Sequence, residues 1–320
     1  MKNFWSSLPR PIFALAPMED VTDAAFRKLI AAKGKPSVMF SEFTSADGLV
    51  LAPPSGQKML RRKLLFSEGE RPIVAQLFTA YPEHMEKAAT LVQELGFDGM
   101  DINMGCPDRS IEKGKCGAAM IQHPELAVEI IKAAKRGAPD IPVSVKTRIG
   151  YAKNELSTWA PTLLGEGIAA LTIHARTRNE MSDVPARWEH VAEVVAIRDR
   201  LGLSTAILGN GDVKDLSDAR NKIAIAQCDG AMLGRAIYGN PWLFSDRESL
   251  PTPSERISAL IEHIHLFDEL LGDTQNYAVM KKHFKAYISG WDNAKDLRAK
   301  LMETTVASQA RALLNVAMLV

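Results

Sequence analysis

Residues 84–107, HMEKAATLVQELGFDGMDINMGCP, contain one complete helix-to-strand unit. Apolar residues recur at helical spacing up to Gly96, which predicts an amphipathic helix that ends at a glycine C-cap. The apolar-rich run at residues 99–104 predicts a buried strand, and a Gly-Cys-Pro turn follows it directly. This order of elements is typical of a parallel sheet with crossover helices.

The same unit recurs along the chain. Short runs of apolar and β-branched residues alternate with stretches long enough for helices, such as PELAVEIIKAAKRG at residues 124–137. Eight βα units with no further strand favour a closed (β/α)8 TIM barrel, an α/β fold, over a doubly wound open sheet. We expect its strands at residues 12–18, 38–43, 73–78, 99–104, 142–148, 170–175, 206–210 and 230–234.

The C-terminal part of the chain differs from the repeated units. The segment SLPTPS at residues 249–254 predicts a linker, and the sequence beyond it looks helical to its end. Residues 251–280 hold one basic and five acidic side chains, whereas residues 281–320 hold seven basic and three acidic ones. We therefore expect a barrel domain over residues 1–248 and a small all-helical domain, partly basic, over residues 249–320.

Composition limits the class of protein. With 320 residues, 46% hydrophobic and 24% charged, the chain has the balance of a globular protein and not of a disordered or fibrous one. No stretch approaches the roughly 20 apolar residues of a membrane helix. Three cysteines without paired spacing argue against a disulfide framework or a structural zinc site, so we expect a reducing cytoplasm. The net charge of +1 does not by itself indicate RNA binding.

Functional residues of such a barrel lie at the C-terminal ends of its strands. A single polar residue there is more simply explained as part of a loop, but a set that converges on one rim indicates an active site. The set in this chain comprises Met18, Glu19, Glu42, Gln76, Asn103, Cys106, Lys146, Arg148, His174, Asn210, Gly234 and Arg235.

Two glycine-containing turns follow the seventh and eighth predicted strands, GNGD at residues 209–212 and LGR at residues 233–235. Loops in these two positions often bind phosphate, because glycine lets backbone N–H groups approach an anion. Arg235 adds a positive charge at this place. Glycine turns are also ordinary connectors, so the position of the turns carries the prediction and not their sequence.

The segment DINMGCPDRSIEKGKCGAAM at residues 101–120 is the most informative in the chain. It places Cys106 on a turn that Pro107 stiffens, at the predicted mouth of the barrel. An ordinary thiol has a pKa of about 8.5, so it is mostly protonated at neutral pH and able to act as a general acid. Buried packing is the alternative for Cys106, and it is what we expect for Cys116 and Cys228.

Several motifs resemble those of one enzyme family. APMEDVTDAAFR (residues 16–27) and NMGCPDRSIEKGKCGAAM (residues 103–120) are similar to the flavin-site and cysteine motifs of the tRNA-dihydrouridine synthases. The resemblance continues in order through VAQLF, VKTRIG, IHARTR, GNGD and MLGRAIYGNPWLF, over residues 12–244. It extends weakly into MKKHFKAYISGW (residues 280–291), which is similar to the start of the family's helical RNA-binding domain. Ala175 stands where the family has glycine, and the tail is shorter than in some members.

The resemblance implies a cytoplasmic, monomeric enzyme that uses FMN and NADPH, or NADH, to reduce specific uridines of tRNA to 5,6-dihydrouridine. It implies that Cys106 donates a proton and that Lys146 faces an anionic atom of the reduced flavin ring, for which a rim ion pair with Glu42 is the alternative. The implied FMN contacts are Pro17, Met18, Gln76, Lys146, His174, Asn210, Gly211, Asp212, Gly234 and Arg235. Asn103, Lys146, Arg148 and His174 would face the target base, while Arg176, Arg178, Lys281, Lys282 and Lys285 are phosphate-binding candidates that are otherwise solvated surface charges.

Two other functions compete with this interpretation. One is an FMN barrel reductase of a free small molecule, similar to the dihydroorotate dehydrogenases, for which a basic helical tail would be superfluous. The other is a non-catalytic RNA-binding protein built on a relic barrel, which the intact cysteine and flavin motifs disfavour.

Overall fold

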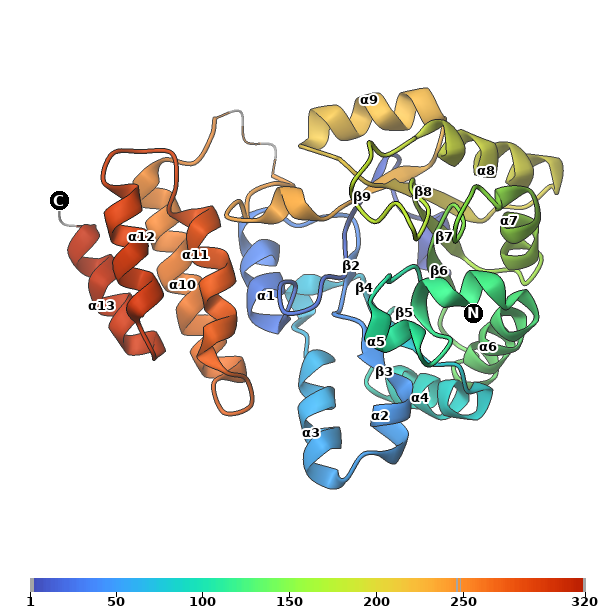
Figure 1. The fold of residues 1–320 in the computed structure, drawn as a ribbon, viewed down its shortest axis with the longest axis horizontal. Coiled ribbons are helices and arrows are strands. Elements are labelled where there is room, and N and C mark those ends of the chain that lie inside the picture. Colours follow the sequence, from blue (N-terminus) through green and yellow to red (C-terminus); the bar gives the residue numbers. More distant parts are fainter. Residues whose placement is uncertain (1–2, 246, 248, 319–320) are drawn as a thin grey trace.

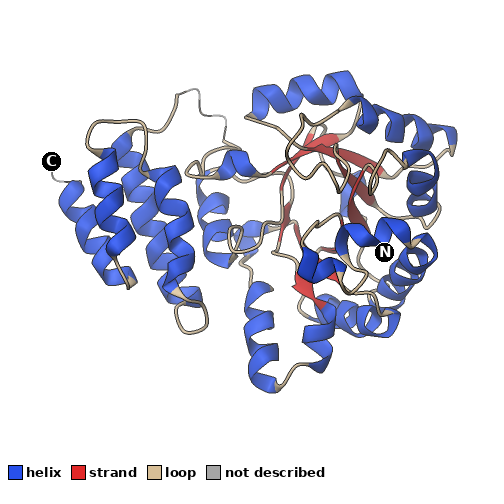
Figure 2. Ribbon diagram, in the orientation of Figure 1, coloured by secondary structure: helices blue, strands red, loops and turns tan. Residues whose placement is uncertain are grey.

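The computed structural model describes residues 3–245, 247 and 249–318. Parallel strands form a barrel that helices surround, and a bundle of further helices lies against one side of it (Figures 1 and 2). The predicted (β/α)8 TIM barrel with a helical C-terminal part is therefore confirmed.

The barrel strands are parallel neighbours in one continuous order. A bridge between Ala14 and Val38, with a hydrogen bond from the Leu15 N–H to the Val38 carbonyl (3.1 Å), joins the first and last strands of that order. The order is β1 (Ile12–Leu15), β9 (Gly230–Leu233), β8 (Ala206–Asn210), β7 (Ala170–His174), β6 (Val143–Arg148), β5 (Gly99–Met104), β4 (Ile73–Phe78) and β2 (Met39–Phe40).

The second predicted strand, over residues 38–43, is wrong in its extent. Two short strands occupy this region, β2 and β3 (Thr44–Ser45), and both pair with β4. Between them the Gln76 N–H bonds to the Ser41 hydroxyl (3.1 Å) instead of to a backbone carbonyl. The side chain of Ser41 thus interrupts the ladder at this point.

Helices cover the outside of the barrel. Helix α6, for example, begins with proline in its first turn and buries Ala127, Ile130 and Ala134, which share one face at helical spacing. The helices that surround the barrel are α1 (Ala24–Lys33), α2 (Ala46–Leu51), α4 (Pro82–Glu94), α6 (Pro124–Gly137), α7 (Leu156–Leu164), α8 (Glu189–Arg200) and α9 (Leu216–Ala226). Helix α3 (Pro54–Lys63) projects away from the barrel and buries none of its residues, and the short helix α5 (Arg109–Glu112) follows strand β5 (Figure 1).

The C-terminal bundle consists of α10 (Pro253–Leu271), α11 (Lys281–Tyr287), α12 (Ala294–Glu303) and α13 (Ala307–Ala317). Helix α10 begins at a capping box of Thr252 and Glu255, inside the predicted linker. It packs on α1, where the Phe26 ring stacks on His263 with centroids 4.7 Å apart. The apolar core of the bundle is therefore continuous with that of the barrel. Along the described chain, no helix combines the length and apolar character needed to cross a bilayer.

Candidate active site

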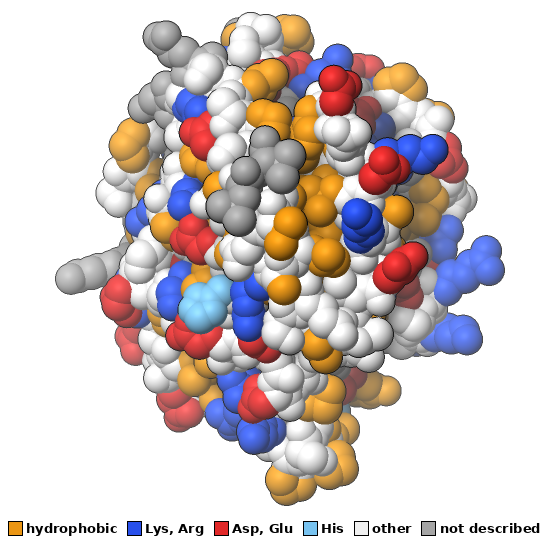
Figure 3. Space-filling model, turned by 90° about the vertical axis from the view of Figure 1, so that its left-hand side faces the viewer, with side chains coloured by type: hydrophobic (Ala, Val, Ile, Leu, Met, Phe, Trp, Pro, Cys, Tyr) orange, Lys and Arg blue, Asp and Glu red, His pale blue; other side chains and the backbone are white. Residues whose placement is uncertain are grey.

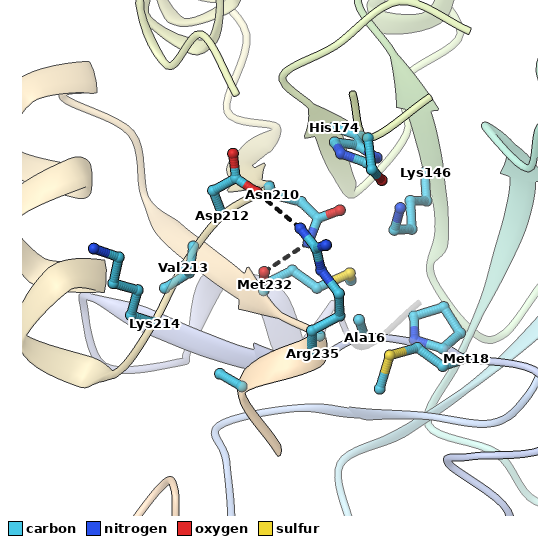
Figure 4. A pocket seen from close by; sticks show the side chains of 15 residues that line it. Ala16, Met18, Lys146, His174, Asn210, Asp212, Val213, Lys214, Met232 and Arg235 are labelled. Carbon is cyan, nitrogen blue, oxygen red and sulfur yellow. Dashed lines mark hydrogen bonds and ion pairs between the residues drawn. The ribbon is translucent and has the colours of Figure 1, made fainter. Parts of the chain in front are cut away.

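A cavity of about 780 Å³ lies at the C-terminal ends of β1, β6, β7, β8 and β9 (Figure 4). Gln76 is the one predicted flavin contact that does not line it, because its side chain is fully buried inside the barrel. Ser182, Val213 and Lys214 line it without having been predicted. Lys214 lies two residues after the GNGD turn, so its positive charge could have indicated in the sequence that it lies near the cavity. The predicted residues that do line the cavity are Pro17, Met18, Lys146, His174, Asn210, Gly211, Asp212, Gly234 and Arg235.

The GNGD turn brings the backbone close to the cavity. Gly211 has a φ of +118°, and a Cβ added there would lie 3.1 Å from the His174 Cδ2 atom. Only glycine fits this position, as its conformation and its surroundings both require. Next to it, the Asn210 amide donates to the Met232 carbonyl (2.8 Å), which fixes the orientation of that side chain.

His174 is neutral in this environment. Burial lowers its pKa well below the ordinary value of 6.5, and the positive charges of Arg148 and Lys146 lower it further. The Nη1 atom of Arg176 lies 3.2 Å from the His174 Nε2 atom. Because a guanidinium can only donate, Nε2 accepts and the ring proton lies on Nδ1. His174 therefore has one N–H donor left for a ligand.

Lys146 projects into the cavity from β6 (Figure 4). Burial, together with the charge of Arg148, lowers its pKa to about 8. The alternative of a rim pair with Glu42 is not found: Glu42 instead accepts a hydrogen bond from the Asp20 N–H (2.7 Å), and the cation near its carboxyl group is Lys63. An anion in the cavity would therefore be attracted by the partly desolvated positive charge of Lys146.

Asp212 joins two arginines with different surroundings. Its carboxylate pairs with Arg176 and, at 2.8 Å, with Arg235. The Arg235 side chain is 67% exposed at the lip of the cavity, so its remaining donors are open to an anion. Arg176 is only 2% exposed, which does not fit a contact with tRNA phosphates. Its place between Asp212 and His174 indicates instead that it holds these two side chains.

The turn that carries Cys106 is fixed from several sides. The Asn103 Oδ1 atom accepts the N–H groups of Gly105 (3.1 Å) and Cys106 (2.9 Å). From β6, the Arg148 Nε atom donates to the Gly105 carbonyl (2.8 Å), while Arg178 pairs with Glu112 just beyond the turn. Arg148 and Arg178 therefore bind other groups of the protein in this structure.

The three cysteines have different surroundings. Cys106 is half-buried just after the end of β5, and burial raises the pKa of its thiol above its ordinary value, so it is protonated at neutral pH. Cys116 is buried, its thiol donates to the Gly114 carbonyl, and burial raises its pKa to about 12. Cys228 is buried next to the start of β9, at the opposite end of the barrel strands.

The predicted basic residues of the tail lie on α11. Lys281 donates to the Met302 carbonyl (2.8 Å), and Lys282 pairs with Asp20 (2.7 Å) in the loop after β1. Lys285 is exposed. Figure 3, which views the molecule from the side of the bundle, shows acidic, basic and apolar side chains interspersed on that face. The bundle thus does not present a uniformly basic surface in this direction.

A family model described as dihydrouridine synthase (Dus) matches residues 14–320. The chain belongs to the dihydrouridine synthase family. It is 40% identical over 316 residues to "Probable tRNA-dihydrouridine synthase 2" of Bacillus subtilis (strain 168), an alignment that covers 98% of this chain and 96% of that protein. It is 39% identical over 316 residues to "Probable tRNA-dihydrouridine synthase" of Staphylococcus aureus (strain COL), with 98% and 95% covered.

Solved structures with the same barrel are more distant from this dihydrouridine synthase. Morphinone reductase in complex with tetrahydroNAD aligns with a TM-score of 0.51 at 13% identity, over 78% of this chain and 90% of that one. A 2-naphthoyl-CoA reductase complex aligns with a TM-score of 0.54 at 12% identity, over 72% and 49%. At such identities the likeness shows the fold alone.

Proposed function

We propose that this chain reduces the C5=C6 bond of uridines in tRNA to 5,6-dihydrouridine, with FMN as cofactor, NADPH or NADH as reductant and Cys106 as proton donor. The observation that carries the proposal is a cavity lined by nine of the ten residues expected to hold a flavin. Cys106 does not line this cavity itself, but its protonated thiol is close enough to the lining residue Lys146 for the charge of that lysine to affect its pKa. Family membership and the names of the curated relatives support the substrate.

The cavity fits FMN in volume and in chemistry. Its 780 Å³ lies within the range of about 300–1,000 Å³ for small-molecule sites. Lys146 would hold an anionic part of the ring, and Arg235, with the backbone at Gly211, would hold the phosphate. When bound and reduced, FMN supplies the hydride that adds to C6 of the base.

The protein's own groups complete the reduction. The target uridine must leave its stack to reach the barrel mouth. Cys106 then gives its proton to C5, which leaves a thiolate. The positive charges of Lys146 and Arg148 both favour that thiolate, although burial disfavours it in the resting site. The Nδ1–H of His174 is a donor available to a carbonyl oxygen of the base.

The division of the chain fits the same substrate. We propose that residues 1–248 form the catalytic domain and residues 249–320 the tRNA-binding domain of a monomeric, cytoplasmic enzyme. Three free cysteines are compatible with a reducing compartment. Exposed Lys285, together with Lys281 and Lys282, would meet the phosphate backbone from α11.

Mass spectrometry of tRNA from a strain lacking this chain tests the proposal. We expect dihydrouridine to be lost at defined positions, to return with the wild-type gene and not to return with Cys106→Ala. The purified protein should be yellow with non-covalent FMN. A deletion that leaves every dihydrouridine in place, together with a protein that binds no flavin after reconstitution, would refute the proposal.

A further inference from the structure

A chain of hydrogen bonds runs through the barrel interior to the Cys106 turn. The Gln76 Nε2 atom donates to Asp101 Oδ2 (2.7 Å), and the Asn103 Nδ2 atom donates to Gln76 Oε1 (3.0 Å). Asn103 Oδ1 in turn accepts the N–H groups of Gly105 and Cys106. All three side chains are buried, and Gln76 and Asp101 are direct neighbours across β4 and β5.

Chemistry fixes the direction of this chain. Backbone N–H groups can only donate, so the Asn103 atom that faces them must be its oxygen. Its NH₂ group then faces Gln76, which must present its own oxygen there. The NH₂ group of Gln76 consequently faces residue 101, where only an acceptor satisfies it.

Asp101 supplies that acceptor. Its other oxygen, Oδ1, accepts from the Ser144 hydroxyl (2.6 Å), so each carboxylate oxygen accepts a hydrogen bond from a neighbouring side chain. Ser144 lies opposite Asp101 on β6 and has the Met100 carbonyl (3.2 Å) as a second partner. A carboxylate at position 101 therefore only accepts hydrogen bonds, and no neighbouring group requires a donor from it.

We infer that Asp101 is a positioning residue, which orients the amides of Gln76 and Asn103 and through them holds the turn that carries Cys106. Without an acceptor at position 101, the Gln76 amide is free to turn round. It would then offer its NH₂ to that of Asn103, and the opposed donors would weaken the hold of Asn103 on the turn.

The same orientation decides what Asn103 offers to a ligand. Its oxygen is occupied by two backbone N–H groups, and one N–H of its amide is occupied by Gln76. The one remaining N–H makes Asn103 a donor, suited to a carbonyl oxygen of uracil and not to an amino group. This part rests on the proposed function, whereas the order of the turn is a property of the chain itself.

The test replaces Asp101 and compares two matched variants. Asp101→Leu removes the acceptor and keeps the branched shape of the side chain, with some added bulk. Asp101→Asn keeps one oxygen that can face Gln76, since its NH₂ can donate to Ser144, which still has the Met100 carbonyl as its own acceptor. Ser144→Ala removes only the other hydrogen bond of the same carboxylate. If Asp101→Leu does not fold, Asp101→Ala removes the acceptor without adding bulk.

The first measurement is the rate at which iodoacetamide alkylates Cys106 in flavin-free protein, followed by peptide mass spectrometry. Buried Cys116 and Cys228 serve as internal references for folding. We expect Asp101→Leu to alkylate roughly fivefold to tenfold faster than wild type, the factor that corresponds to losing one buried hydrogen bond. Asp101→Asn and Ser144→Ala should stay within about twofold. Equal acceleration in all three variants, or none in Asp101→Leu, would overturn the inference.

The second measurement is the oxidation of the reduced enzyme by tRNA. Asp101→Leu should slow it roughly tenfold while NADPH-driven flavin reduction stays within about twofold, and Asp101→Asn should recover most of the rate. A normal rate of tRNA-dependent oxidation in Asp101→Leu also contradicts the inference. The alkylation result needs neither flavin nor RNA, so it decides the role of Asp101 even if the proposed function fails.

Discussion

Replacing Cys106 by alanine removes the proposed acid and leaves the rest of the cavity intact. Acid catalysis typically contributes about 10²–10⁴-fold, and this is the expected loss in dihydrouridine formation at pH 7. Burial raises the pKa of the wild-type thiol, so the rate of the wild-type chemical step should fall less than that of the variant between pH 7 and pH 9. The variant should differ, because Lys146, with a pKa of about 8, can give up a proton in this pH range, whereas Arg148, with a pKa of about 10, stays protonated.

The residual rate of Cys106→Ala can be worked out from Lys146. With a pKa of about 8, roughly nine-tenths of Lys146 is protonated at pH 7 and roughly one-tenth at pH 9. If this ammonium supplies the remaining proton, the residual rate falls about tenfold over that interval. Control measurements on the same variant are FMN content and NADPH-driven flavin reduction, both of which should match wild type.

Single-turnover oxidation of the reduced enzyme by tRNA, read from the flavin absorbance, isolates the chemical step from product release. Cys116→Ala is the matched control, since its thiol is buried and bonded to the Gly114 carbonyl. It should be near normal. A normal rate in Cys106→Ala combined with failure of Cys116→Ala would reverse the roles assigned to the two cysteines.

The remaining predictions concern the cofactor, the tail and pH. Arg235→Ala should raise the Kd for FMN roughly tenfold, so that less FMN stays bound to the protein during gel filtration. An unchanged amount of bound FMN would exclude Arg235 from the phosphate site. Lys285→Glu should weaken tRNA binding and reduce its dependence on salt without affecting NADPH oxidation, and an unaltered salt slope would exclude this residue from the interface. Burial raises the pKa of Glu42 from 4.5 to about 7, so the stabilisation from its bound proton is fully present below about pH 4.5 and is lost as the pH rises through 7. Urea unfolding of Glu42→Gln should show a stability–pH curve flatter by up to about 3 kcal/mol, and a curve parallel to wild type would contradict this.

The barrel could be predicted because its strands follow local patterns. Strands β4, β5 and β8 match the expected residues, since helices and the barrel interior bury them on both sides and leave an apolar run. The second strand could not be bounded, because its interruption depends on a contact between Ser41 and Gln76, 35 residues apart. No pattern within residues 38–43 signals that contact.

The lining of the cavity could be predicted where its residues lie at the ends of barrel strands. Every barrel strand delivers its last residues to one rim, so most residues that line the cavity could be placed without knowing the packing. That Gln76 does not line the cavity could not be foreseen, because the layer that a side chain occupies inside the barrel depends on strand register. Arg176 and Lys282 pair with Asp212 and Asp20, which lie 36 and 262 residues away, and such partners leave no trace in the local sequence.

Burial shifts the pKa values of the ionisable groups in the site, but these groups have different charges at pH 7. Burial raises the pKa of both Asp101 and Cys106, yet Asp101, with a pKa of about 6, is mainly ionised at pH 7 while the thiol is not. Burial has the opposite effect on Lys146, which nevertheless remains mainly charged at this pH. An acid is therefore available in the same site as a fixed positive charge and a fixed hydrogen-bond acceptor. In the proposed reaction the charges of Lys146 and Arg148 favour the thiolate that proton donation would leave, whereas burial keeps the thiol protonated beforehand.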